Sequence, residues 1–337
     1  MGKGIIADLL EDISVLSKKD KSKKFQPSDV NPNDFIVAPS REQESVIELE
    51  SEDVKIDTFF ELTDMKKIFA IDSTSNTLGR VEKGIVASVR GALISVQPNL
   101  EPSIEIVGPE IIKITFDNKT SMYRELRKKY FFSTDSVKSP EVFKMPDRIR
   151  NIIERVVQFR LVKNNPKSIF LFDGSLITGT VDSPNSVMKE MKEQAEKNNS
   201  VMVAVSKHTI VTDNKGNDLT QKLELNNKPC YIDVTNKVNL ANQSRYLGKI
   251  FVVRFKPSGY AFRVDVFPKD SDVNKIFGII AKYCGPDGYP DPLRLAHIFC
   301  VFDPSEILAM QAYAIDKYAL TIEQRIRPVL FGPWSKG

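Results

Sequence analysis

Two short apolar segments of this 337-residue chain each run into a single aspartate that small polar residues follow. The first is Ile68–Ile71, before Asp72, and the second is Ile169–Phe172, before Asp173. Four consecutive apolar residues of this kind predict a strand buried on both faces, as in the middle of an α/β sheet. Because ligands and metals bind at the carboxyl ends of such strands, we expect both aspartates to meet at that edge. The alternative is that each aspartate caps a following turn or helix.

The predicted elements around the two aspartates follow an order known from one architecture. Strand segments continue from the first aspartate to residue 116, and helices are predicted at about 121–130 and 147–163. The second aspartate strand, a helix at 184–198 and a strand at 201–205 complete the series. Three strands, helix, strand, helix and strand are the order of an RNase H-like domain, whose first and fourth strands carry metal-binding aspartates. We therefore expect an α/β fold with an RNase H-like mixed sheet flanked by helices.

The rest of the chain divides around this core. Further strands and helices are predicted at about 249–255, 260–267, 271–283, 291–301 and 304–319. Apolar residues at helical spacing over residues 4–16 predict an amphipathic helix, and a basic run and a polar, proline-containing stretch follow it. We expect an N-terminal helix and irregular connector over 1–55, an RNase H-like domain over 56–320 and a tail over 321–337. Residues 208–246 show little periodicity, so we interpret them as an insertion or dimerisation arm.

The composition is that of an ordinary globular protein, with 41% apolar and 27% charged residues. No run of consecutive apolar residues reaches the length of a membrane span, and the N-terminus lacks a signal-peptide core. We therefore expect a cytoplasmic protein without a membrane partner. The widely spaced Cys230, Cys284 and Cys300 predict neither a zinc site nor a disulfide framework. A net charge of +4 is compatible with nucleic acid as a partner. The sequence lacks the glycine-rich loop of a phosphate-binding α/β enzyme, so it does not support that class of function.

Clustered carboxylates are hard oxygen ligands, which suit Mg²⁺ or Mn²⁺ and phosphoryl transfer. A nuclease of this architecture needs a third carboxylate, which usually comes from the helix before the fourth strand. Glu154 lies on that predicted helix at the edge of its apolar stripe, and Glu125 on the preceding helix is its rival. The alternative for either glutamate is a surface residue in helix salt bridges.

A second informative run lies at residues 288–297, where a tyrosine precedes a proline-opened helix that contains a histidine. We expect this arrangement to present Tyr289 and His297 at one sheet edge. His297 is a candidate to hold a metal or the scissile phosphate, or to move a proton near neutral pH. The alternative is a packed core histidine beside a structural tyrosine.

Several short motifs occur in a fixed order over about residues 60–300. They are Ala70–Ser73, Phe172–Leu176, Val203–Lys207, Phe262–Asp265, and Tyr289–Pro290 with Leu295–His297. In this order they resemble the NurA family of archaeal DNA-end-processing nucleases. The resemblance implies an RNase H-like (Piwi-like) core that acts as a homodimer and depends on Mn²⁺, with Mg²⁺ as an alternative ion.

The resemblance also implies a substrate, a partner and roles for site residues. Members of the family cleave single-stranded DNA endonucleolytically and trim DNA ends with 5′ to 3′ polarity, together with the hexameric ATPase HerA, in double-strand-break repair. Asp72, Glu154 and Asp173 would hold one or two ions, with His297 as a nitrogen ligand. Tyr289 would belong to the same catalytic group.

Two further surfaces complete these expectations. Lys207 and Arg263, each at a strand end or hairpin, are candidates for contacts with DNA phosphates. On the predicted 291–301 helix, Leu293 and Ile298 lie off the side that suits the core, so we expect an exposed apolar patch that docks the ATPase. The alternative is that the N-terminal helix or the dimer mate covers this patch.

The alternative function is a catalytically silent RNase H-like module that binds nucleic acid or acts as a scaffold. The carboxylates argue against it, because a protein that only binds does not need buried acids that repel each other.

Overall fold

The computed structural model describes residues 7–18, 45–49, 54–63, 66–132, 137–207, 209–237 and 245–321. The predictions for the basic run after Lys18, for most of the connector and for the tail after Thr321 fall outside these residues. The strands are β1 (Ser45–Glu48), β2 (Ile56–Thr58), β3 (Ile68–Val81), β4 (Gly84–Val96), β5 (Ser103–Thr115), β6 (Ile169–Asp173), β7 (Val201–Ser206), β8 (Thr209–Thr212), β9 (Cys230–Asp233), β10 (Lys249–Arg254) and β11 (Ala261–Phe267). The helices are α1 (Ala7–Lys18), α2 (Lys119–Tyr130), the short 3-10 helix η3 (Val142–Lys144), α3 (Met145–Asn164), α4 (Asn185–Lys197), α5 (Leu219–Glu224), α6 (Val273–Lys282), α7 (Asp291–Cys300) and α8 (Pro304–Tyr318).

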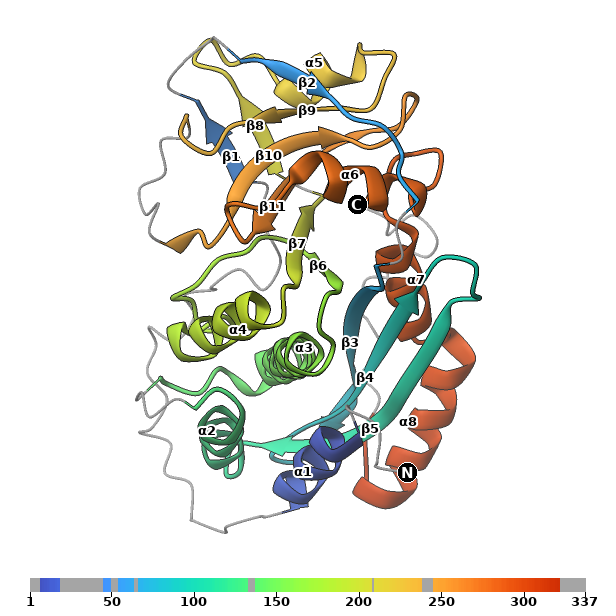
Figure 1. The fold of residues 1–337 in the computed structure, drawn as a ribbon. Coiled ribbons are helices and arrows are strands. Elements are labelled where there is room, and N and C mark those ends of the chain that lie inside the picture. The colour runs from blue at the N-terminus through green and yellow to red at the C-terminus, as the bar shows by residue number, and fades with distance from the viewer. Residues whose placement is uncertain are drawn as a thin grey trace.

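Both aspartate strands lie inside one mixed sheet (Figure 1). Within the described residues its nine strands follow the order β2-β9-β10-β11-β7-β6-β3-β4-β5. The first three long strands form an antiparallel meander, and β6 pairs in parallel with both β3 and β7. This part of the sheet has the strand order of an RNase H-like domain, so the predicted fold is confirmed. Strand β11 then adds to β7 in the antiparallel direction and begins an extension of the sheet.

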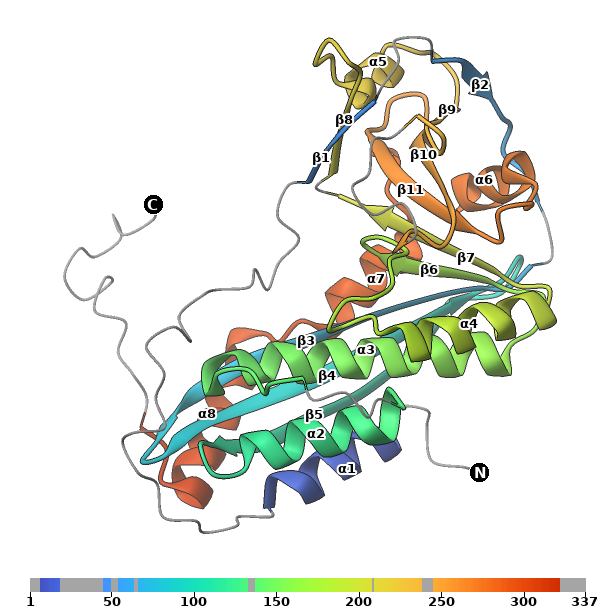
Figure 2. The ribbon, with the colours of Figure 1, turned by 90° about the vertical axis from the view of Figure 1, so that its left-hand side faces the viewer.

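Helices cover both faces of the sheet (Figures 1 and 2). Helices α1 to α4 lie on one face, and α6, α7 and α8 lie on the other. Side chains of β3 alternate between the two layers: Phe69 and Ile71 belong to the core under α3, while Ile68 and Ala70 belong to the core under α6 and α7. The apolar run at the start of β3 is therefore buried on both faces, as its composition predicted.

The first aspartate strand does not end at its aspartate. Strand β3 continues from Asp72 to Val81, because β4 pairs with it as far as the Val81–Gly84 turn and supplies partners for its backbone. In contrast, β6 ends at Asp173 as expected. The parallel pairing of β3 with β6 is registered only as far as Ala70 and Leu171. The two strands thus stop pairing just before the level of their aspartates.

Residues 208–246 contain more regular structure than their sequence suggested. Strand β8 pairs with β1, α5 begins at Leu219 with Asp218 as its N-cap, and β9 pairs with β10 and extends the main sheet. Short apolar elements of this kind fill a small core of their own, which includes Ile47, Val211 and Leu223. A role of this segment as an insertion or dimerisation arm stays a prediction.

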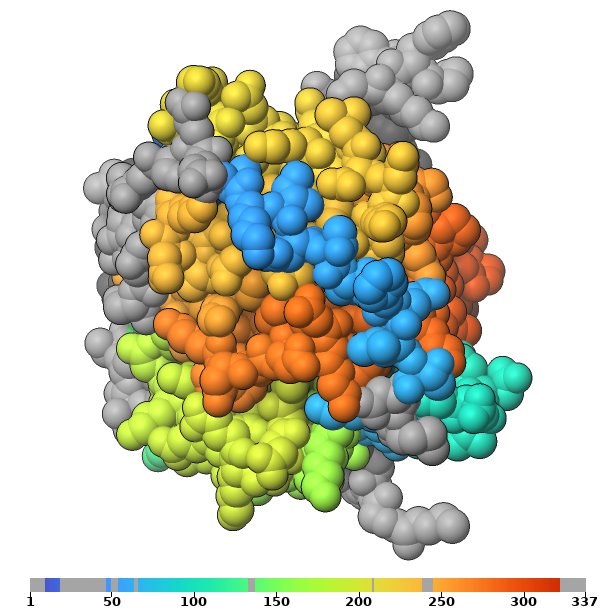
Figure 3. Space-filling view, turned by 45° about the horizontal axis from the view of Figure 1, so that its top comes forward, coloured from blue at the N-terminus to red at the C-terminus, as the bar shows by residue number. Residues whose placement is uncertain are grey.

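The segment 54–63 lies on the surface of this extension of the sheet (Figure 3), where β2 pairs with β9 in the antiparallel direction as the outer strand. Phe59 is buried against the rings of Tyr231 and Phe277, and its N–H donates to the carbonyl oxygen of Pro229 at 3.3 Å. Farther along, Leu62 N donates to Gly278 O at 3.0 Å. The connector therefore enters the domain through contacts with α6 and β9, consistent with a core that begins near Phe59.

The stretch Asp291–Tyr318 is apolar and long enough, by composition alone, to be a candidate membrane span within the described residues. In the fold it is two helices, because Asp303 and Glu306 form a capping box that starts α8 at Pro304. Each helix buries one side on the sheet, with Ala296 and Cys300 of α7 and the Met310 side of α8 enclosed. The helix predicted at about 304–319 is confirmed.

Candidate active site

The two aspartates follow the point where β3 and β6 stop pairing. Continuing the Ala70–Leu171 register by two residues on each strand sets Asp72 opposite Asp173. Because alternate residues of a strand share a face, both carboxylates lie on the face of the sheet that α7 covers. The predicted meeting of the two aspartates at one edge of the parallel strands therefore follows from the observed register.

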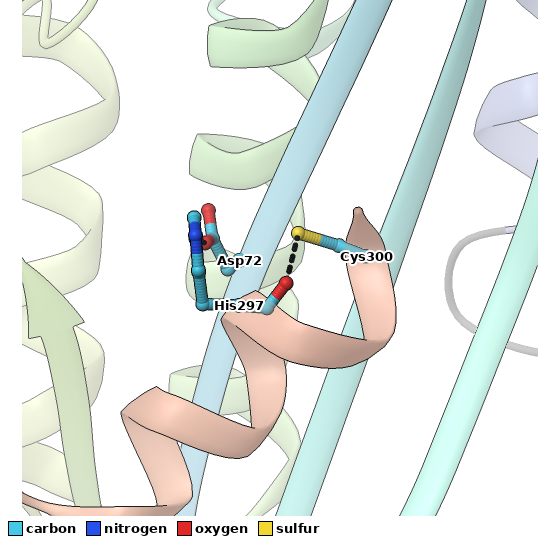
Figure 4. Close-up of side chains that lie close together, drawn as sticks. All are labelled: Asp72, His297 and Cys300. Atoms are coloured by element: carbon cyan, nitrogen blue, oxygen red, sulfur yellow. Dashed lines mark hydrogen bonds and ion pairs between the residues drawn. The ribbon is translucent and has the colours of Figure 1, made fainter. Parts of the chain in front are cut away.

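Helix α7 brings His297 to Asp72, as Figure 4 shows. His297 Nδ1 donates to Asp72 Oδ2 at 2.8 Å, since an ionised carboxylate can only accept. The other oxygen, Oδ1, accepts from the backbone N–H of Ser73 at 2.7 Å. Asp72 is 13% exposed, whereas the His297 side chain is 59% exposed, so the imidazole faces solvent from one side of the carboxylate. This contradicts the alternative of a packed core histidine.

Glu154 reaches the same place from α3 on the other face of the sheet. The Ser73 hydroxyl donates to Glu154 Oε2 at 3.2 Å, and Gln158 Nε2 donates to Oε1 at 3.3 Å. Burial, followed by the charges of Asp72 and Asp173, raises the pKa of Glu154 to about 7. Three carboxylates from separate elements therefore act on one another electrostatically.

The rival glutamate lies elsewhere. Glu125 is exposed on α2, a helix that packs against α1 and α3 rather than against the aspartate strands. The geometry favours Glu154 as the third carboxylate.

Asp173 has a cationic partner. Lys207, the residue after β7, donates from Nζ to Asp173 Oδ2 at 2.9 Å. The same ammonium lies 5.0 Å from the centre of the Tyr289 ring, which also packs edge-on against Phe262. Tyr289 is thus buried next to the lysine that binds Asp173. The predicted proximity of Tyr289 and His297 to the two aspartates is observed, one on each side.

The donor set fits a hard divalent cation. Asp72, Glu154 and Asp173 offer carboxylate oxygens and His297 a nitrogen, and of these Asp72 and His297 have potential ligand atoms within 4.8 Å of each other. Burial and then the charges of the two aspartates raise the pKa of Glu154, although Arg150 and Arg155 act in the opposite direction, so a bound cation would favour its ionised form. Mn²⁺ and Mg²⁺ prefer oxygen ligands, and Mn²⁺ also accepts a nitrogen ligand.

Comparison with known proteins identifies the domain that carries these residues. A family model described as the NurA domain matches residues 66–299 of the chain. The matched region includes Asp72, Glu154, Asp173 and His297. This chain belongs to the NurA family.

Several solved structures have a related arrangement at low sequence identity. The NurA nuclease from Sulfolobus solfataricus is 16% identical, with a TM-score of 0.48 over 77% of this chain and 87% of that one. A NurA structure with manganese is 10% identical, with a TM-score of 0.40 over 77% and 91% of the two chains. Endonuclease V from Ciona intestinalis, in complex with inosine-containing DNA, is 13% identical, with a TM-score of 0.37 over 74% and 89%. Among curated proteins, no match is found.

Arg263 of this NurA domain does not have the surface position expected of a phosphate contact. Its guanidinium is buried and binds Asp265 through two hydrogen bonds of 2.9 Å, from Nε and Nη2. Asp265 Oδ2 also accepts from Leu176 N at 3.0 Å, just after the Asp173 strand. The expectation is corrected: a bidentate arginine–carboxylate pair favours a buried position, and here it anchors the loop that follows Asp173. Lys207 is exposed beside Asp173 and remains a candidate for phosphate contact.

Leu293 of the NurA domain is also misassigned by the sequence. It is 3% exposed and belongs to the core under α6 and α7, so it cannot form part of a docking patch. The buried residues Leu293, Ala296 and Cys300 form one helical stripe of α7, which packs against β3 and β4. The sequence therefore assigned Leu293 to the wrong side of the helix. Ile298 is 56% exposed, as expected.

Two residues of the site were not predicted. Ser73 joins Asp72 to Glu154, and its only sequence signal was its place directly after the aspartate. Cys300 lies within 4.8 Å of donor atoms of both Asp72 and His297. Its signal was the spacing of three residues from His297, which puts both side chains on one side of a helix.

His297→Ala is expected to reduce DNA cleavage sharply and to leave the melting temperature near that of the wild type, because the ring is largely exposed. Specific activity and thermal unfolding are measured on the same preparations. Leu308→Ala, an exposed substitution on α8, is the matched control and should change neither quantity. A large loss of stability with normal specific activity would mean that the histidine is structural.

Proposed function

We propose that this chain is a Mn²⁺-dependent deoxyribonuclease that cleaves single-stranded DNA and resects DNA ends in the 5′ to 3′ direction. The observation that carries the proposal is the grouping of Asp72, Glu154 and Asp173 in one region, where burial and then the charges of the two aspartates raise the pKa of Glu154 to about 7. A group of acids that repel one another is unfavourable in the free protein and is stabilised when a cation binds between them. Membership of the NurA family, a family of nucleases, supports the same reading.

The residues of the site have distinct proposed roles. Asp72, Glu154 and Asp173 hold one or two divalent ions, which supply activation of water and stabilisation of the leaving oxygen. His297 fixes the orientation of Asp72 through the 2.8 Å hydrogen bond and is a further nitrogen ligand. Lys207 neutralises Asp173 in the free protein and is positioned, next to the bound ion, to contact a DNA phosphate.

Tyr289 has a supporting role in this proposal. Its ring lies against the Lys207 ammonium at 5.0 Å and holds that side chain beside Asp173. The tyrosine therefore acts on the site through the lysine.

Metal removal tests the proposal directly. Single-stranded DNA is incubated with the protein in Mn²⁺, in Mg²⁺ or in EDTA, and the products are resolved by length. Cleavage in Mn²⁺, weaker cleavage in Mg²⁺ and none in EDTA are expected. Binding of DNA without cleavage in any metal would support the silent binding module instead.

The proposed partners are a second copy of the chain and a HerA-type hexameric ATPase. Exposed Ile298 lies two residues before the buried Cys300 and directly after His297, and it is therefore close to the mouth of the site. An apolar side chain in this position is suited to contact with the ATPase that delivers DNA.

Ile298→Glu is expected to abolish co-elution with the ATPase and to leave the homodimer and single-strand cleavage intact, because the side chain is exposed. Leu225→Glu, at an exposed leucine just after α5, is the matched control. Size-exclusion chromatography with the ATPase, followed by a cleavage assay, makes the comparison. Retained co-elution, or collapse of the dimer to a monomer, would rule out docking at Ile298.

A further inference from the structure

Three different donor atoms meet on one side of the proposed carboxylate site. A carboxylate oxygen of Asp72, a ring nitrogen of His297 and the sulfur of Cys300 all lie within 4.8 Å of one another (Figure 4). His297 and Cys300 come from the last turns of α7, and Asp72 comes from β3. Glu154 and Asp173 contribute no sulfur or nitrogen, so this group differs in chemistry from the three carboxylates.

Oxygen, nitrogen and sulfur together are the ligand types of zinc. Zn²⁺ binds cysteine sulfur at about 2.3 Å and histidine nitrogen or carboxylate oxygen at about 2.0–2.2 Å, which separates neighbouring ligand atoms by roughly 3.3–3.7 Å. The atoms here are already near that spacing: His297 Nδ1 lies 2.8 Å from Asp72 Oδ2, and the sulfur lies within 4.8 Å of both residues. An opening of about half an ångström between nitrogen and oxygen and a small rotation of the thiol would complete a three-ligand site.

The surroundings suit a bound ion with one open position. Cys300 is 1% exposed, so its sulfur lies on the protein side of the group, whereas the His297 ring faces solvent. Three protein ligands and one solvent-facing position are the arrangement of zinc sites that keep an open coordination position. Without metal, the Cys300 thiol donates to the carbonyl oxygen of His297 at 3.3 Å.

We propose that Asp72, His297 and Cys300 bind one Zn²⁺ ion, and that this ion inhibits the nuclease. On binding, the thiol proton and the proton between His297 and Asp72 leave for solvent, and nitrogen, oxygen and sulfur bond to the metal. Mn²⁺ binds sites with nitrogen, oxygen and sulfur ligands more weakly than Zn²⁺ does, and the sulfur ligand increases this preference for zinc. Asp72 and His297 are then no longer available as ligands of the proposed Mn²⁺ site.

The two parts of the proposal depend on different premises. The zinc site itself goes beyond the proposed function and needs no nuclease activity. The inhibition rests on the proposed function, because it assumes that Asp72 belongs to the Mn²⁺ site.

Burial and the neighbouring Asp72 raise the pKa of the Cys300 thiol. The free thiol is therefore protonated at neutral pH, and a coordinating metal has to displace its proton.

Cobalt absorption tests the site without DNA. Co²⁺ is titrated into metal-free protein, and thiolate coordination is read from the near-ultraviolet charge-transfer band. Wild type and Cys284→Ser, a substitution at another buried cysteine, should give the band at one equivalent, and Cys300→Ser should lack it. His297→Ala, at an exposed position, should weaken binding without unfolding the protein. An equal band in Cys300→Ser, or no band in the wild type, would overturn the site.

Zinc competition then tests the inhibition. Against a chromophoric chelator, Cys300→Ser should bind Zn²⁺ at least about a hundredfold more weakly than the wild type, because even the loss of an outer-shell partner costs 10–100-fold. Cleavage in Mn²⁺ is measured with increasing Zn²⁺ and normalised to the zinc-free activity of each variant. Wild type and Cys284→Ser should lose activity at zinc concentrations that Cys300→Ser tolerates. Inhibition curves that coincide, or cleavage supported by zinc alone, would overturn the inhibitory role while leaving a cobalt-binding site in place.

Discussion

Asp72→Ala and Asp173→Ala are each expected to lower Mn²⁺-dependent cleavage of single-stranded DNA to background while the protein stays folded. A metal ion supplies several kcal/mol of charge stabilisation in the transition state of phosphodiester hydrolysis, and loss of about 4 kcal/mol corresponds to about a thousandfold in rate. Either aspartate is an essential ligand under the proposed function, so neither substitution should leave measurable turnover.

The expected stability of these variants follows from the contacts they remove. Asp72 accepts hydrogen bonds from His297 and from the backbone of Ser73, and its removal also relieves repulsion with Glu154. Asp173 binds Lys207 in a partly exposed ion pair, a kind of contact worth about 0–1 kcal/mol. Neither loss is large for a fold with two extensive apolar layers.

Cleavage rates and circular dichroism melting curves of both variants give the test. Asp270→Ala, in the exposed turn between β11 and α6, is the matched control and should behave as the wild type. Cleavage near the wild-type rate by either variant, with the same dependence on metal, would remove the basis of the proposed metal site.

The part of this site that could be predicted from sequence is the part with a strong local pattern. The buried strand before Asp173 and the helix with Glu154 follow from apolar runs and apolar periodicity, and the architecture fixes which elements neighbour each other. The continuation of β3 past Asp72 had no such pattern, because the polar residues from Ser73 onward are held in the strand by pairing with β4. Pairing of this kind depends on a partner elsewhere in the chain.

Tertiary contacts explain the misassigned residues. Leu293 looked exposed because apolar residues occur on more than one side of α7, and only the packing on β3 and β4 shows which side faces the core. Arg263 looked available for DNA, yet Asp265 two residues later shares its face of the strand and binds it. The spacing of two residues between Arg263 and Asp265 was visible in the sequence. Cys300 escaped notice for a related reason: it has no nearby cysteine, and only the fold brings it to Asp72.

Glu154→Gln is expected to have two opposite effects, loss of cleavage and a more stable metal-free fold. The amide keeps the shape of the side chain and a hydrogen-bonding oxygen for Ser73, but it removes the negative charge that a divalent ion requires. Activity should therefore fall as far as in the aspartate variants. The gain in stability has a separate cause: the charge of Glu154 is buried, and Asp72 and Asp173 also repel it.

The pH dependence of that gain can be stated with its sign. The pKa of Glu154 is about 7 in the folded protein, against an ordinary value of 4.5 in an unfolded chain. As the pH rises from 4.5 to 7, the unfolded chain releases a proton that the folded protein retains, so the free energy of unfolding of the wild type falls. The difference between the two pKa values corresponds to about 3 kcal/mol, which is fully lost above pH 7. Below pH 4.5 the glutamate is protonated in both the folded and the unfolded state, so it does not lower the free energy of unfolding.

Melting temperatures of wild type and Glu154→Gln in EDTA, measured from pH 4.5 to 8, separate this account from a purely structural role of the glutamate. The two proteins should melt together at the acid end, and the variant should become the more stable one as the pH approaches 7. Glu125→Gln, exposed on α2, should follow the wild type at every pH. Mn²⁺ at pH 7.5 should stabilise the wild type more than Glu154→Gln, because only the wild type has the third carboxylate. Parallel melting curves across the whole pH range would mean that the pKa of Glu154 is not raised in the folded protein. Loss of activity in Glu125→Gln alone would assign the third ligand to α2.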